Sequence, residues 1–214
     1  MITVYVFGSA PSAVVNVTRD LRVVWALEEC GLPYRLQPLD ALRGEHKQDA
    51  YTRVQPFRQL PSIDDDGFRL FESAAIVLYA AEKSGRLLPD GVRARALAAQ
   101  WTLAAVNTVE PPLIELFTID HFAAGSAWAA ERRPTVVERA QARLAALDAE
   151  LARRRYLLGD DFSAPDILMT TVLRIAHGSG LLEAAPNVAG YVERCEARPA
   201  WKKVLAEHRQ RLAA

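Results

Sequence analysis

The sequence predicts an α/β region with a mixed four-stranded sheet, followed by a region made of helices alone. Strand signals occur only in the first part of the 214-residue chain, where β-branched and aromatic runs alternate with helical segments. The acidic turn at residues 64–67, Asp-Asp-Asp-Gly, lies between two short apolar runs and requires an antiparallel pair of strands. After Lys83 the strand signals stop and apolar residues recur at helical spacing.

The first elements are a strand, a helix and a second strand. Ile2 to Phe7 is β-branched and aromatic, and the small and polar residues from Gly8 to Val17 form a loop of the kind that can surround a ligand. Thr18 is a plausible N-cap for a helix from Arg19 to Cys30. Tyr34 to Gln37 then alternates as a strand. The connection between the two strands is long enough for a right-handed parallel crossover.

The segment from Gln59 to Ser73 combines a hairpin with the start of a helix. Leu60 to Ile63 and Phe68 to Phe71 are its two strands, and a run of good helix formers follows Glu72-Ser73. A proline beside a strand, an exposed strand end and a helix N-terminus together make a corner that can hold a small anionic ligand. From these residues alone, a proline-initiated strand with an ordinary helix cap is an equal alternative.

The rest of the chain predicts helices. We expect domains at residues 1–83 and 92–214, joined by a Gly/Pro-rich linker at 84–91. Ser163 and Asp166 form a capping box for a buried helix that starts near Pro165. The other expected helices are Arg93 to Glu110, broken by Pro111-Pro112, then Leu113 to Ala124, Pro134 to Arg154, Val188 to Ala197 and Pro199 to Leu212.

Composition narrows the class of protein. Lysine plus arginine equals aspartate plus glutamate at 26 each, so nothing favours nucleic acid as a partner. The N-terminus lacks the features of a signal peptide, and no apolar run is long enough to cross a membrane. Cys30 and Cys195 are far apart, and the four histidines show no zinc-like spacing, so no metal is expected. We therefore expect a soluble cytoplasmic protein.

Four motifs together resemble the cytosolic glutathione transferases over nearly the full length of the chain. They are Trp25 to Tyr34, which closes the first helix, Leu60 to Ile63, Leu70 to Ile76, and Phe162 to Ile167 in the helical half. Their order and separations make the signal specific. The resemblance suggests a bacterial member and leaves its class open.

This resemblance implies a thioredoxin-like N-terminal domain, an all-helical C-terminal domain, a homodimer and a glutathione site on the N-terminal domain. Pro61 would be a cis-proline that exposes the Leu60 backbone to the peptide of glutathione. Ser73, with the helix N–H groups, would bind the γ-glutamyl carboxylate, and Glu72 the γ-glutamyl ammonium.

Two positions depart from the family pattern. Gln59 would meet the glycyl end of glutathione, where many relatives carry a lysine or arginine, and Arg58 is the neighbouring cation that would substitute. The loop after the first strand is longer than usual, so two alignments with the family are possible, and each selects a different residue to stabilise the thiolate. Counting from the strand selects Ser9 or Ser12, and counting back from the helix selects Asn16 or Thr18. We favour Thr18 and Asn16, because the helix N-terminus stabilises a thiolate.

The expected function is conjugation of the glutathione thiolate to a small electrophile, as in detoxification, with glutathione as cosubstrate and no metal. Glutathione-dependent reduction of disulfides or peroxides uses the same site and stays open. A non-catalytic binding module with this fold is the alternative of another class. Four residues are candidates to line a second-substrate pocket between the domains: Trp101, Asn107, Phe117 and His121.

Overall fold

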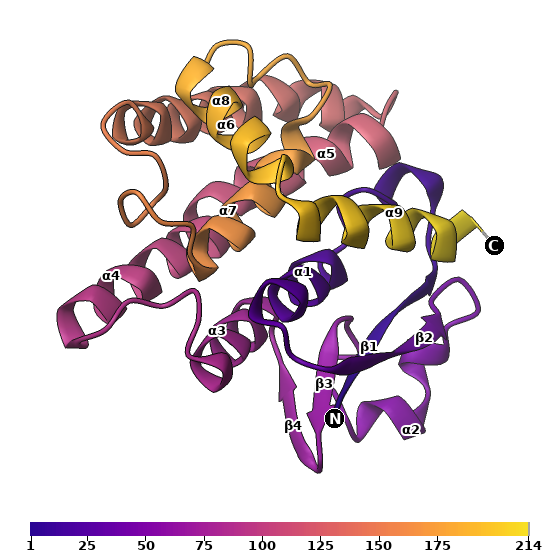
Figure 1. Cartoon of the computed structure of the whole chain (residues 1–214). Helices are drawn as coiled ribbons and strands as arrows, with labels where there is room; N and C mark the ends of the chain where they lie inside the picture. Colours follow the sequence, from indigo (N-terminus) through magenta and orange to yellow (C-terminus); the bar gives the residue numbers. More distant parts are fainter. Residues whose placement is uncertain (214) are drawn as a thin grey trace. The chain divides into compact units, whose positions relative to one another are not determined.

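The structure, a computed structural model, describes residues 1–213 and consists of two compact units (Figure 1). The first unit contains Met1–Leu88 together with the chain from Arg198 onward. The second unit is Pro89–Ala197.

The sheet of the first unit has four strands in the order β2-β1-β3-β4. They are β1 (Ile2–Ser9), β2 (Tyr34–Asp40), β3 (Ser62–Asp65) and β4 (Phe68–Phe71). β1 is parallel to β2 and antiparallel to β3, and β3 and β4 are antiparallel. This is the mixed four-stranded sheet that the sequence predicts.

The turn between β3 and β4 explains the acidic sequence there. Asp66 and Gly67 both have a positive φ, of 53° and 95°. A two-residue hairpin turn of the favoured hand needs a positive φ at both positions, which Asp and Gly tolerate best. The Asp64 carboxylate fixes the turn by accepting the Gly67 N–H at 2.8 Å.

Helices cover both faces of this sheet. Figure 1 shows α1 and α3 on one face and α2 on the other. The helical segments of the unit are η1 (Ser12–Val14), α1 (Asp20–Cys30), η2 (Glu45–Lys47), α2 (Asp49–Thr52), α3 (Ser73–Ser84) and α9 (Pro199–Ala213). Nearly all of α1 is buried, because it packs against β1, α3 and α9.

The start of α1 differs from the prediction. Arg19 is the N-cap residue and makes no side-chain capping bond, and Thr18 contributes only its carbonyl oxygen, which accepts the Leu21 N–H at 3.3 Å. The Thr18 hydroxyl is instead bonded to His208 of α9. The prediction that Thr18 caps the helix is therefore wrong, because a distant element engages its side chain.

The described residues of the second unit form helices joined by loops, with one isolated β-bridge between Tyr156 and Gly159. Its segments are α4 (Val92–Leu103), the π-helix η3 (Ala104–Val109), α5 (Glu110–Phe122), α6 (Ala127–Leu151), α7 (Ala164–Leu173), η4 (Arg174–Ala176) and α8 (Pro186–Glu196). The predicted capping box is present at α7, where the Asp166 carboxylate accepts the Ser163 N–H at 2.8 Å. The same carboxylate accepts the Leu157 N–H at 2.9 Å and the Tyr191 hydroxyl at 2.9 Å.

Two helix boundaries correct the sequence prediction. Pro111 and Pro112 do not break the chain into two helices, because they fall in the first turn of α5, where a missing N–H costs little. α6 begins at Ala127, seven residues before the expected start, and carries Pro134 inside it. Residues on both sides of Pro134, including Ala129 and Val136, are buried and keep the helix continuous.

The C-terminal helix packs with the first unit rather than the second. The Trp201 and Trp25 rings lie 4.7 Å apart between centroids, and Arg198 donates two hydrogen bonds of 2.7 Å to the Glu29 carboxylate. The two units thus differ from the expected division at the C-terminus. The domain boundaries at residues 83 and 92 stay a prediction.

Candidate functional site

The first part of the candidate site is the chain just before β3. Leu60 and Pro61 are joined by a cis peptide bond, and both side chains are buried. Buried Tyr51 donates its hydroxyl to the Gln59 carbonyl at 2.7 Å, and Gln55 accepts the Gln59 N–H at 3.2 Å. Within residues 1–213, no backbone or side chain bonds to the main chain of Leu60. Its N–H and C=O form a strand end that an extended peptide can pair with.

The second part is the N-terminus of α3. Ser73 is its first residue and is buried, and no side chain caps the helix. The first N–H groups of a helix have no intrahelical acceptor and carry a partial positive charge. The Arg22 guanidinium, buried in α1, donates to the Ser73 Oγ at 3.3 Å. This end of α3 is therefore electropositive and suited to a carboxylate.

Glu72 precedes the helix in an unusual conformation. Its φ is 69° and its ψ is 110°, which costs a residue with a side chain on the order of 1–3 kcal/mol. The Glu72 side chain is exposed. Such strain at a ligand-binding corner is a common feature of functional sites.

Gln59 and Arg58 are both exposed beside this corner. A polar group of the same unit, in η2, was not found from the sequence. The Nδ1 atom of His46, in η2, is buried and bonded to nothing else among the described residues. Burial and the neighbouring Lys47 lower the pKa of His46. A basic pair in a polar loop carries no distinctive spacing, so only the structure reveals the unsatisfied nitrogen.

The three catalytic candidates all have partners in the first unit. Ser9, at the end of β1, donates to the Asp40 carboxylate and accepts the Leu42 N–H at 3.1 Å. Asn16 is exposed, and its Oδ1 accepts from the Arg209 guanidinium at 2.7 Å. Thr18 is buried, and its Oγ1 lies 3.0 Å from His208 Nε2.

The partners of His208 fix its tautomer. Nε2 lies 2.7 Å from the Val15 carbonyl oxygen, which can only accept, so Nε2 carries the proton. Nδ1 lies 2.7 Å from an Arg211 nitrogen, which can only donate, so Nδ1 carries a lone pair. The imidazole is therefore neutral. Burial lowers the pKa of His208. The negative charge of Asp20 opposes this effect, and the positive charge of Arg211 adds to it.

Candidates for the second-substrate pocket lie in the second unit. Phe117 and His121 line a cavity of about 290 Å³, with ring centroids 4.3 Å apart. Burial lowers the pKa of His177 in the same cavity, and the Arg174 charge adds to this. Trp101 lies under the Arg154 guanidinium at 5.7 Å, and Asn107 is exposed. The expected placement of the pocket between domains stays a prediction.

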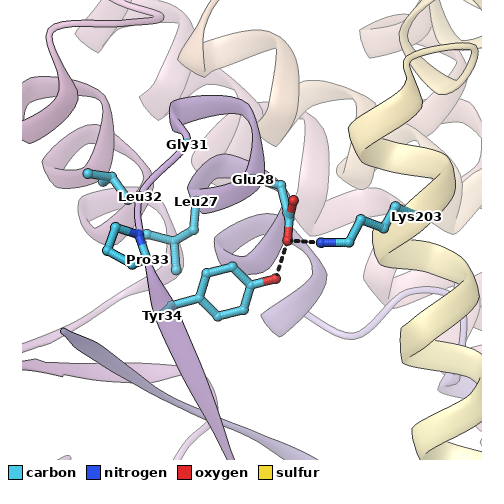
Figure 2. A pocket seen from close by; sticks show the side chains of 7 residues that line it. All are labelled: Leu27, Glu28, Gly31, Leu32, Pro33, Tyr34 and Lys203. Carbon is cyan, nitrogen blue, oxygen red and sulfur yellow. Dashed lines mark hydrogen bonds and ion pairs between the residues drawn. The ribbon is translucent and has the colours of Figure 1, made fainter.

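A surface hollow of about 500 Å³ in the first unit lies beside the end of α1. Figure 2 shows the Tyr34 hydroxyl and the Lys203 ammonium both pointing at the Glu28 carboxylate. Burial opposes ionisation, but the hydrogen bonds from Lys203 and Tyr34 hold the pKa of Glu28 below its usual value. Glu28, Tyr34 and Lys203 are thus hydrogen-bonded to one another, and the Lys203–Glu28 ion pair joins α9 to α1. The hollow is therefore not proposed as a ligand site.

Comparison with known proteins decides the family. The family profile described as glutathione S-transferase, N-terminal domain, matches residues 21–83, and the C-terminal domain profile matches 117–199. Glutathione S-transferase F9 of Arabidopsis thaliana is 30% identical over 199 residues, covering 87% of this chain and 92% of the relative. The chain belongs to the glutathione S-transferase family. Glutathione S-transferase 3 of Zea mays is 32% identical over 200 residues, covering 87% and 88% of the two chains.

Solved structures of this family agree with the fold. Glutathione transferase F2 of Populus trichocarpa has a TM-score of 0.86 at 26% identity, covering 98% of this chain and all of the other. A family member from Pseudomonas fluorescens, solved with two glutathione molecules bound, has a TM-score of 0.85 at 26% identity, covering 95% and 92%. The predicted thioredoxin-like domain followed by a helical domain is confirmed. Because relatives come from plants and bacteria, the suggested bacterial origin stays a prediction.

Two absences concern the described residues. No group of three or more His, Cys, Asp or Glu side chains is placed to hold a metal ion within residues 1–213. In the same part of the chain, no helix is both long and apolar enough to span a membrane.

Proposed function

We propose that this family member conjugates the thiolate of glutathione to a small electrophilic molecule. The observation that carries the proposal is the corner made by the free main chain of Leu60 and the uncapped N-terminus of α3. Glutathione is an extended peptide with two carboxylates, and this corner offers a strand end for the peptide and an electropositive helix end for a carboxylate.

In this proposal each part of glutathione has its own partner. The cysteinyl main chain pairs with Leu60, which Pro61 holds at the strand end. The γ-glutamyl carboxylate binds Ser73 and the first N–H groups of α3, and Glu72 binds the ammonium. Gln59 contacts the glycyl end, with Arg58 as the adjacent cation.

Thr18 is the proposed donor to the thiolate. Because His208 Nε2 carries the proton that the Val15 carbonyl accepts, it has no lone pair for the Thr18 hydroxyl, whose hydrogen is left to donate elsewhere. A hydroxyl that donates to sulfur favours the thiolate over the thiol. Asn16 and Ser9 are the second and third choices, because Arg209 and Asp40 already engage their polar atoms.

Calorimetric titration with glutathione, followed by a conjugation assay with an activated aryl halide, tests the proposal. We expect saturable binding at millimolar or lower concentration and conjugation faster than the uncatalysed reaction. Absence of binding at millimolar glutathione would remove the transferase and the reductase alternatives together. Reduction of a mixed disulfide without conjugation would favour the reductase.

A non-catalytic binding module is the second candidate, and one observation favours it. All three candidate thiolate donors have hydrogen-bond partners within the protein. This candidate predicts glutathione binding with no acceleration of conjugation and no lowering of the thiol pKa of bound glutathione. The assays above therefore separate the two functions.

The remaining parts of the proposal concern the context of the enzyme. We propose a homodimer that works in the cytoplasm in detoxification. The cavity lined by Phe117 and His121 is the proposed contact for the electrophile.

A further inference from the structure

The C-terminal end of α9 is bonded at several points to the segment that links β1 to α1. His208 contacts the Val15 carbonyl and Thr18, and Arg209 donates to Asn16. Arg211 donates to the Phe7 carbonyl at 3.0 Å and to the Asp20 carboxylate at 3.1 Å. Asp20 and His208 are almost completely buried, so water is largely excluded from their bonds, whereas the Arg209–Asn16 bond is exposed.

The contacts require a neutral imidazole at the centre. A proton on Nδ1 would face the Arg211 guanidinium at 2.7 Å, and the Arg211–Nδ1 hydrogen bond would be lost. The charged groups around His208 are Asp20 from α1, with its Oδ2 at 3.9 Å, and Arg209 and Arg211 from α9. Glu207 lines the same small void beside the ring. Two of these groups repel an imidazolium, and the attractive carboxylate of Asp20 is already paired with Arg211.

We propose that α9 clamps residues 7–18, and that His208 is a positioning residue whose neutral ring holds the Thr18 hydroxyl in place for the thiol of glutathione. The catalytic half of this inference rests on the proposed function. The clamp itself does not, because its contacts join residues of the first unit to one another.

The clamp should weaken as the pH falls. The pKa of His208 is lowered in the folded protein. His208 therefore binds a proton more readily when the contacts between α9 and residues 7–18 are broken, the open form, than when they are made, the closed form. The closed form is favoured fully above the ordinary pKa of 6.5, and it loses stability as the pH falls from there toward the lowered value.

Hydrogen exchange of the ligand-free protein tests the clamp. We expect amides in residues 9–19 to exchange about tenfold faster in His208→Ala than in the wild type at neutral pH. His208→Gln, which can donate to Val15 and accept from Arg211 but cannot titrate in this range, should keep the protection. It should also keep it as the pH falls below 6.5, where the protection of the wild type declines. Lys203→Gln is the control on the same helix, because it removes the α9 contact to Glu28 and leaves the loop untouched.

Conjugation kinetics test the positioning role. His208→Ala should lower kcat about tenfold with little change in the KM for glutathione, because His208 bonds to Val15 and Thr18 and not to Leu60 or Ser73. His208→Gln should restore kcat and remove the part of the acid limb of the pH profile that the imidazole causes. Equal exchange and equal pH profiles in the wild type, His208→Ala and His208→Gln would overturn the inference while leaving glutathione conjugation intact. A wild type that shows the exchange effect but no conjugation would instead overturn the proposed function and the positioning role, and keep the clamp.

Discussion

Ser73 lies where two electropositive features meet, the N-terminus of α3 and the guanidinium of Arg22. We expect Ser73→Ala to raise the KM for glutathione about tenfold, because it removes a hydrogen bond to a charged group. The kcat should change little. Ser84→Ala is the matched control, since Ser84 lies at the other end of α3 and its hydroxyl donates to the Ala81 carbonyl. Equal KM values for the two variants would argue against a carboxylate at Ser73.

Thr18 is the residue on which the proposed chemistry depends. Thr18→Val keeps the shape of the side chain and removes the hydroxyl, so we expect a lower kcat and a higher thiol pKa for bound glutathione. Thr18→Ser should retain most of both. Ultraviolet absorbance of the bound thiolate across a pH series measures this pKa. If Ser9→Ala shifts the pKa and Thr18→Val does not, the strand-based alignment of the loop is the correct one.

Local sequence signals, together with the family resemblance, predict the cis-proline and helix start of the corner, and the structure contains both, while the binding roles of its residues stay predictions. Leu60, Pro61 and Ser73 lie in one short stretch whose turn and helix signals place them at a single corner. Thr18 was assigned a capping role because its sequence neighbours favour one. Its actual side-chain partner, His208, is 190 positions away, and no local pattern connects the two.

At the scale of single helices, the start of α7 is held by a buried capping box. The Asp166 carboxylate accepts from two backbone N–H groups and the Tyr191 hydroxyl, and burial raises its pKa. We expect Asp166→Ala to reduce the free energy of unfolding by about 3 kcal/mol, because it removes a cap and leaves buried donors without an acceptor.

Asp148 also accepts N–H groups at the start of a helix, but its side chain is less buried than that of Asp166. Its carboxylate, on α6, accepts the N–H groups of Asn187 and Val188 at the start of α8. Asp148→Ala should cost only about 1 kcal/mol, because water can replace the lost acceptor. Urea denaturation followed by circular dichroism measures both variants. A loss for Asp148→Ala as large as for Asp166→Ala would contradict burial as the deciding factor.

Helix predictions were sound in the middle of elements and weaker at their ends. The periodic apolar residues of α6 and the capping box of α7 are strong signals, and both helices are present. Prolines account for two wrong helix boundaries. Pro111 and Pro112 lie in the first turn of α5, directly after a π-helical segment, and Pro134 lies inside α6. Tertiary packing decides such cases, and it is not visible in a local window.

For the whole molecule, we expect a homodimer. Sedimentation equilibrium should give a mass near twice 23.6 kDa. A monomer across micromolar concentrations would contradict assembly of the kind implied by the family resemblance.

The fold class was predictable because strand signals and helical periodicity occupy separate parts of the chain. The position of α9 was not, because its apolar residues, including Trp201 and Val204, fit packing against any helical neighbour. Only the long-range contacts with α1 show that this helix belongs to the first unit.

The most direct test of the central claim is the thiol pKa of glutathione bound to the wild-type protein, measured by thiolate absorbance. The account predicts saturable binding and a bound thiol pKa well below the free value of about 8.5 for a cysteine thiol. Bound glutathione with an unshifted thiol pKa would contradict the transferase proposal and leave a binding module.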